Sequence, residues 1–99
     1  MKGTEKQIKW AEDIISETRE SLSAHIAYCR EKAAGTEIPD FWQRDAHIWE
    51  AISAEYERTI SQIDSAAVVI DNRKLLDSAR MQWYFNEIST GHLPGFPGV

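Results

Sequence analysis

Apolar residues recur at seven-residue intervals through the first third of the chain. Seven residues make almost two turns of an α-helix, so residues with this spacing lie on one face. The apolar stripe consists of Ile8, Ala11, Ile14, Ile15, Leu22, Ile26 and Cys29. Thr4 and Gln7 have the spacing of a capping box, which marks the start of a helix. The pattern predicts a long amphipathic helix from Thr4 to about Ala33.

A second long helix is predicted after the segment GTEIPD, residues 35–40. Gly35 suits the C-terminal cap of the first helix, and Pro39 cannot continue it. Asp40 and Gln43 repeat the capping-box spacing and predict a new helix start at Asp40. Apolar residues then follow at steps of three and four, namely Trp49, Ile52, Tyr56, Ile60, Ile63, Ala67 and Ile70. We therefore expect the second helix to continue to Ile70.

The last part of the chain predicts a shorter helix and an irregular tail. The segment DNRK, residues 71–74, favours a break because Asp and Asn side chains compete with the helical backbone. A third helix is expected over 76–89, followed by Gly91. Its inward residues are expected to be Leu76, Ala79, Trp83 and Ile88. Residues 91–99 are rich in Pro and Gly and predict an irregular tail, so a single helical domain is expected over residues 1–90.

These elements predict an all-α fold, an antiparallel hairpin of two long helices with a shorter third helix. A hairpin alone leaves much of two apolar stripes exposed, and the third helix can cover only half their length. A closed three-helix bundle would satisfy the pattern. A homo-oligomer that completes a four-helix core would satisfy it equally well, and we expect self-association to complete the bundle.

Composition limits the classes of partner. The net charge of −5 opposes direct binding to duplex nucleic acid or to an anionic membrane. Cys29 is the single cysteine, which excludes an intrachain disulfide and favours a reducing compartment. The N-terminus lacks the apolar stretch of a signal peptide, and no apolar run approaches the ~20 residues of a membrane span. A cytoplasmic location is therefore expected.

Motifs that carry catalytic chemistry are missing from the sequence. His25 and Cys29 lie four residues apart and could supply two metal ligands, but two ligands do not make a site. The chain has no Glu-x-x-His motif, no nucleophile elbow and no phosphate-binding glycine loop. We expect a protein that is not an enzyme, with no catalytic residue, metal or cofactor.

Four acidic residues of the expected second helix lie seven positions apart. They are Glu50, Glu57, Asp64 and Asp71. On one continuous helix their carboxylates would form a line with ~10.5 Å between neighbours. This acidic line is either the solvated edge of an amphipathic helix or a face presented to a basic partner.

Basic residues gather just after the acidic line, at Arg73, Lys74 and Arg80, close in sequence to Trp83 and Tyr84. Guanidinium groups can fork onto phosphate while an aromatic ring stacks on a base, so this set suits a nucleotide or other small ligand. Arg73 and Lys74 also suit the carbonyl end of a helix, where the dipole favours cations. Both interpretations fit the sequence.

Ten aromatic residues, four of them Trp, are more than so small a core needs. Trp49, Tyr56 and Trp83 lie on expected core stripes and should pack inside. Trp10 and Trp42 lie off the stripes, where they either cover one end of the hairpin or anchor an interface.

The opening segment GTEKQIKWAEDI, residues 3–14, resembles the start of small uncharacterised helical proteins of bacteriophages and mobile elements of gut bacteria. AAVVIDNRK, residues 66–74, is similar to a second block of that family, which tends to have an aromatic residue at the position of Val68 or Val69. The resemblance implies a phage or mobile-element setting and brings no catalytic residues. Short acidic proteins in that setting often bind a host factor, for example to inhibit a defence system by masking a nucleic-acid-binding surface or by sequestering a signalling nucleotide.

The sequence thus favours a non-catalytic interaction protein that binds a host protein. The residues expected to contact the partner are Trp10, Trp42, Glu50, Glu57, Asp64 and Asp71. The alternative is a nucleotide or small-ligand binding protein that uses Arg73, Lys74, Arg80, Trp83 and Tyr84. A second alternative is a structural assembly subunit.

Overall fold

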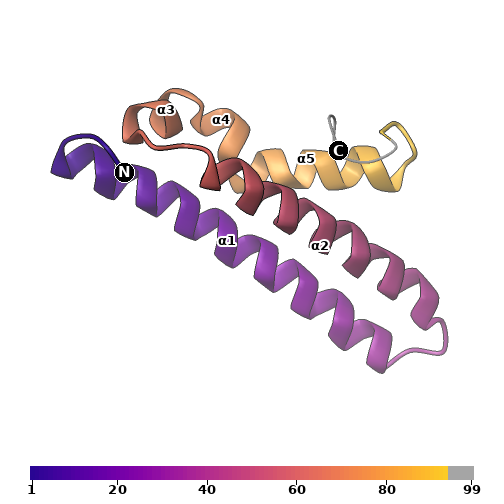
Figure 1. Ribbon diagram of the computed structural model, residues 1–99. Coiled ribbons are helices and arrows are strands. Elements are labelled where there is room, and N and C mark those ends of the chain that lie inside the picture. Colours follow the sequence, from indigo (N-terminus) through magenta and orange to yellow (C-terminus); the bar gives the residue numbers. More distant parts are fainter. Residues whose placement is uncertain (94–99) are drawn as a thin grey trace.

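A computed structural model describes residues 1–93 and is helical over most of them (Figure 1). It contains five helices in the described part, namely α1 (Glu5–Ala34), α2 (Pro39–Ser61), α3 (Ala66–Asp71), α4 (Arg73–Leu76) and α5 (Ser78–Ser89). There is no named strand in these 93 residues, and one isolated bridge joins Lys2 to Ser65. The predicted all-α class is confirmed. Most of the predicted irregular tail lies outside the described residues.

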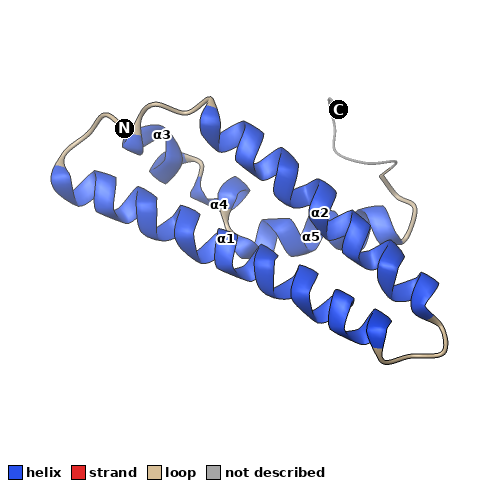
Figure 2. Cartoon of the chain, turned by 60° about the horizontal axis from the view of Figure 1, so that its bottom comes forward, coloured by secondary structure: helices blue, strands red, loops and turns tan. Residues whose placement is uncertain are grey.

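The two long helices pack against each other along their length, and the three short helices lie against them (Figure 2). α2 runs back beside α1, α3 and α4 pack against α1, and α5 packs against both long helices. The result is an elongated body of 51 × 26 × 18 Å. Among the described residues, no helix has both the length and the apolar character needed to cross a membrane.

α1 begins and packs as its sequence predicts. Thr4 Oγ1 accepts the Gln7 amide at 3.2 Å, and Gln7 Oε1 accepts the Thr4 amide at 3.0 Å, which completes the capping box. The Gly35 amide donates to Lys32 O at the other end. The buried residues of the helix are Ala11, Ile15, Thr18, Leu22 and Cys29. The predicted apolar stripe therefore faces the core.

α2 begins two residues earlier than predicted, because the N-cap is residue 38 and not Asp40. Its N-cap is Ile38, which provides no side-chain hydrogen bond, and Pro39 is the first helical residue. The predicted capping box of Asp40 and Gln43 is wrong. Proline has the backbone angle of a helix and lacks an amide to satisfy, so Pro39 itself starts the helix.

α2 also ends earlier than predicted, at Ser61 instead of Ile70. The backbone of the N-terminal segment pairs here with the backbone that follows α2, and a continuous helix would not leave those groups free to pair. The Lys2 amide donates to Asp64 O at 2.7 Å, and the Ala66 amide donates to Lys2 O at 2.8 Å. These two bonds hold the backbone of Asp64 and Ala66 against Lys2, and α3 starts after the extended Ser65.

The break predicted within residues 71–74 is present at Asn72, which separates α3 from α4. Asn72 Nδ2 donates to Val68 O at 2.8 Å, beside its own backbone amide, which donates to the same carbonyl at 3.1 Å, so the side chain closes the end of α3. A further break follows at Asp77, whose Oδ1 accepts the Arg80 amide and caps α5. The third helix is therefore interrupted.

The Asp77 break changes which residues of the third helix face inward. Leu76 is buried as predicted, but it belongs to α4. In α5 the buried residue is Met81, whereas Ala79 is exposed and Trp83 is 42% exposed. The prediction that Ala79 and Trp83 pack inside is wrong, because α5 starts anew at Ser78 with its own orientation.

Candidate functional site

The predicted acidic line does not exist as one helical face. Glu50 and Glu57 lie on α2, but Asp64 lies in the turn that follows and Asp71 ends α3. Because α2 stops at Ser61, the seven-residue spacing no longer aligns these last two carboxylates with the first two.

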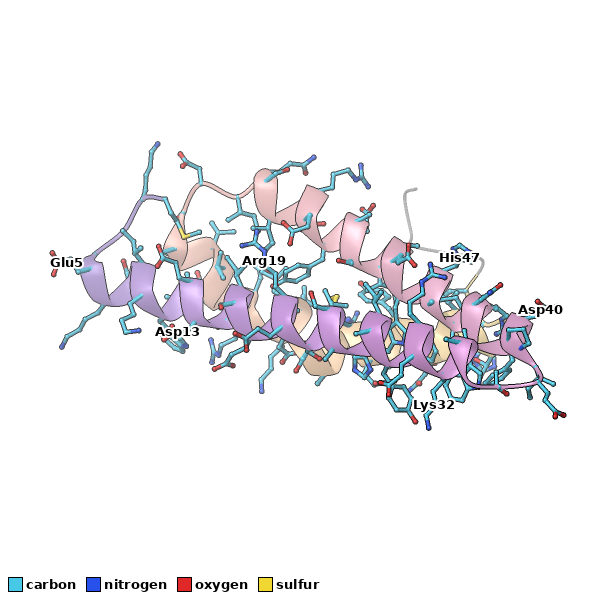
Figure 3. The ribbon with its side chains drawn as sticks, turned by 90° about the horizontal axis from the view of Figure 1, so that it is seen from below. Glu5, Asp13, Arg19, Lys32, Asp40 and His47 are labelled. Atoms are coloured by element: carbon cyan, nitrogen blue, oxygen red, sulfur yellow. The ribbon has the colours of Figure 1, made fainter. Side chains whose placement is uncertain are left out.

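Cations of the N-terminal part pair with three of these four carboxylates. Arg19 of α1 donates from Nε and Nη2 to Glu57 at 2.6 and 2.8 Å, and it lies between the long helices (Figure 3). Arg30 pairs with Glu50, and Lys2 Nζ lies 3.5 Å from Asp64 Oδ2.

The Arg19 hydrogen bonds hold the pKa of Glu57 below its usual value. The same contact raises the pKa of Arg19. Both groups therefore remain charged and paired at neutral pH. The edge of α2 is a set of cross-helix ion pairs and offers less free negative charge to a partner than its sequence indicates.

The predicted ligand-binding residues divide into two groups. Arg73 and Lys74 of α4 border a hollow of about 190 Å³ beside α1. Arg73 lies over the ring of Trp10, 5.5 Å from its centroid, and Nη1 donates to Ile70 O at 2.8 Å. The structure therefore pairs Arg73 with the indole of Trp10 and with the carbonyl end of α3.

The charge in this hollow is balanced. Glu17 and Asp77 also line it, together with Arg73 and Lys74. Two carboxylates beside two cations leave little net attraction for a polyanion such as a nucleotide.

The second group lies on α5. Arg80 stacks over Trp83, 4.4 Å from its centroid, and lies 5.3 Å from the centroid of Tyr84. These three residues come together as predicted, but they line a different part of the surface from Arg73 and Lys74. Arg80 Nε is buried without a hydrogen-bond partner, so the guanidinium is held mainly by ring stacking.

A cluster of exposed aromatic and apolar side chains surrounds the turn between α1 and α2, and we call it the turn patch. It consists of Tyr28, Ile38, Phe41 and Trp42. Tyr28, Ile38 and Phe41 are 52%, 66% and 51% exposed, and Trp42 is half-buried. The ring of Trp42 contacts those of Tyr28 and Phe41 edge to face, at 5.8 and 5.2 Å between centroids.

The two tryptophans expected at a binding surface are far apart. Trp42 belongs to the turn patch, near Lys32 and Asp40 at one end of the molecule (Figure 3). Trp10, half-exposed, lies in the second turn of α1 towards the other end, where Glu5 marks the start of the helix. They cannot both contact one small partner surface.

Inside the molecule, Trp49 lies between two other rings. His25 of α1 stacks on one face at 4.0 Å, and Phe85 of α5 stacks on the other at 4.4 Å, both nearly parallel. Burial lowers the pKa of His25 below its ordinary value. The stack of three rings, centred on Trp49, thus joins α1, α2 and α5.

Burial also affects two groups near the turn patch. It raises the pKa of the Cys29 thiol and that of the Asp45 carboxyl, and the negative charge of Asp45 adds to the effect on Cys29. A thiol with a raised pKa is a poor nucleophile. Within residues 1–93, no group of three or more His, Cys, Asp or Glu side chains is arranged to hold a metal ion.

Comparisons with protein-family models, with curated proteins and with solved structures found no match to this chain. The interpretation of its surface therefore depends on geometry. Sequence reasoning missed Tyr28 and Ile38, which complete the turn patch. Their signal was present: Tyr28 adjoins the stripe residue Cys29 on the solvent side, and Ile38 is an apolar residue in an otherwise polar turn.

Proposed function

We propose that the protein is a non-catalytic interaction protein that binds another protein through the turn patch. The observation that carries the proposal is the exposure of Tyr28, Ile38 and Phe41 around the fixed ring of Trp42. Large apolar side chains that are exposed together and held by ring contacts lose little conformational entropy on binding. Such side chains are typical anchors of protein interfaces.

The size of the patch favours an anchor within a larger contact. Tyr28 and Phe41 each expose about half of a side chain of about 200 Å², and Ile38 exposes most of its side chain. Together they expose on the order of 300 Å² of apolar area. A stable interface buries about 800 Å² per partner. The partner must therefore contact neighbouring polar residues as well.

The surroundings of the patch fit the polar rim of such an interface. Lys32, whose Nζ lies 5.4 Å from the ring centroid of Tyr28, and Arg44 supply positive charge. Glu37 and Asp40 supply negative charge. A rim of mixed sign suits a protein that presents an apolar groove with polar edges, and it gives no advantage to a nucleic acid.

The resemblance to phage and mobile-element proteins supports a host protein as the partner. In that setting, binding would inhibit the host protein, for example a component of a defence system. The residues of the predicted acidic line play a smaller part in this proposal than Trp42, because cations of the same chain pair with Glu50, Glu57 and Asp64.

Photo-crosslinking in the bacterial host tests the proposal. The photoreactive residue benzoylphenylalanine replaces Ile38 in the turn patch, or, as a control, the exposed apolar residue Val68 on α3. We expect one discrete adduct with a host protein from position 38 and none from position 68. Adding Phe41→Ser to the position-38 variant should abolish the adduct while the circular dichroism spectrum stays unchanged.

Three outcomes would contradict the proposal. They are no adduct at position 38, equal adducts at both positions, and an adduct that Phe41→Ser leaves intact. An adduct of twice the chain mass would identify the patch as a self-association surface, and light scattering on the purified protein would then show an oligomer. Self-association that survives Phe41→Ser would place the predicted oligomer interface elsewhere.

A further inference from the structure

A second cavity lies where the end of α2, the α3–α4 junction and the start of α5 meet, and we call it the α2–α5 cavity. Its volume is about 260 Å³. The buried side chains of Tyr56, Leu76 and Met81 form its floor, and Leu75, which is 50% exposed, lies at its mouth. Phe41 of the turn patch is about 27 Å away along α2, so the two features are separate.

The lining of the cavity carries no charged side chain among the described residues. Its polar groups have internal partners. Tyr56 Oη donates to Leu76 O at 2.9 Å, and Thr59 Oγ1 donates to Glu55 O at 2.9 Å. Asn72 Nδ2 donates to Val68 O, which leaves the side-chain oxygen of Asn72 as an acceptor.

This chemistry selects an uncharged ligand. A charged molecule would lose hydration inside the cavity and find no opposite charge there, which is costly. An apolar ring would instead replace water against Leu76 and Met81 and contact the ring of Tyr56. One hydrogen-bond donor on the ligand could bind an acceptor on the lining.

The volume limits the size of the ligand. Ligand pockets usually measure about 300–1,000 Å³, and this cavity lies just below that range. It therefore suits a molecule of one ring or two fused rings. We propose that the α2–α5 cavity binds a small, uncharged aromatic molecule that carries a single hydrogen-bond donor, of the indole or phenol class.

Titration of the full chain with indole, followed by NMR, tests the proposal. We expect saturable chemical-shift changes centred on Met81, Leu76 and Thr59, with an increase in melting temperature. Indole-3-carboxylate has the same rings and one negative charge, and we expect it to bind at least tenfold more weakly. This comparison needs no variant and so does not depend on the folding of a mutant.

Two variants localise the site. Thr59→Leu fills part of the cavity and should weaken indole binding at least tenfold, whereas Thr59→Ser keeps the hydroxyl and should leave binding unchanged. Leu75→Ala changes a half-exposed residue at the mouth and should weaken binding severalfold without unfolding the protein.

The proposal is overturned if indole causes no saturable change, if the changes centre on the turn patch, or if the carboxylate binds equally well. It is also overturned if Thr59→Leu binds indole normally. If light scattering shows a dimer in which Met81 and Leu75 contact the second copy, the cavity belongs to a self-association interface and the small-molecule proposal fails.

Discussion

The carbonyl of Leu76 should act as a shared acceptor that couples α1 to α2. It lies at the break between α4 and α5 and is buried. Tyr56 Oη donates to it at 2.9 Å, and Thr18 Oγ1 lies 3.0 Å from it and 2.9 Å from Ile14 O. A hydroxyl has one proton, so Thr18 can serve either carbonyl, and it can serve Leu76 when Tyr56 is changed.

The expected losses of stability follow from the ability of the Thr18 hydroxyl to donate to Leu76 O when Tyr56 no longer does. Tyr56→Phe removes one donor, Thr18 replaces it, and the free energy of unfolding should fall by about 1 kcal/mol or less. Thr18→Val leaves the bond from Tyr56 and should cost a similar amount. The double variant leaves a buried carbonyl without a donor, so its loss should exceed the sum of the single losses by about 1–3 kcal/mol.

Urea unfolding followed by circular dichroism would measure this coupling, provided that the four proteins share one m-value. Tyr56→Phe combined with Thr90→Val is the control, because the Thr90 hydroxyl also donates to a carbonyl four residues earlier, that of Asn86, but lies far from Leu76. The control pair should be additive. Additivity within about 0.3 kcal/mol for the Thr18 and Tyr56 pair would refute the shared acceptor.

Three further predictions concern the N-terminal segment that precedes α1, the stack of His25 on Trp49, and the ion pair of Arg19 with Glu57. Gly3 has φ of +144°, and a Cβ there would lie 3.1 Å from the Cβ of Ala66, so Gly3→Ala should lower the free energy of unfolding by about 1–3 kcal/mol. Gly35 has φ of −109°, and a Cβ there would lie at an ordinary contact distance of 3.8 Å from Glu31 O, so thermal unfolding should show little change for Gly35→Ala. Because burial lowers the pKa of His25, the unfolded chain binds its proton first, and stability should fall as pH drops below about 6.5. His25→Gln should remove that part of the pH dependence in a series of urea titrations, whereas an unchanged pH profile would contradict the assignment. Glu57→Gln should cost less than about 1 kcal/mol by the same titration, because its pair with Arg19 is half-exposed, and a larger loss would show that the pair is a structural necessity.

The parts of the fold that depend only on residues close in sequence were predictable. The capping box at Thr4 and Gln7 and the stripe from Ala11 to Cys29 both arise within one helix, so local sequence contains all the information. The break at Asn72 is local too, since its side chain bonds within its own turn.

The end of α2 was not predictable from local pattern. No Gly or Pro lies between Ser61 and Ala66, and the apolar spacing continues through Ile63 to Ile70. The helix ends because Lys2, more than 60 residues earlier, pairs with the backbone there. A tertiary contact overrides the helical preference of the segment.

The predicted acidic line failed for the same reason, because a tertiary contact ends α2, and the prediction for Trp42 failed as well. The acidic line required a continuous helix and took no account of Arg19 and Arg30 on α1, which face it across the groove. Trp42 was predicted to lie off the stripe, but it stands seven residues before Trp49 on the same face of α2 and packs against the core, which leaves its ring half-buried. Its partners Tyr28 and Ile38 join it only when the turn brings the helices together.

The stack of His25, Trp49 and Phe85 gives the molecule an internal optical reporter. A protonated imidazole accepts an electron from an excited indole, so emission from Trp49 should dim when His25 takes up a proton and recover when it is released. Since the three rings come from three different helices, the same emission should also change when any one of those helices moves away. With the other three indoles replaced by phenylalanine, one fluorophore would report both proton occupancy and helix separation without any added label.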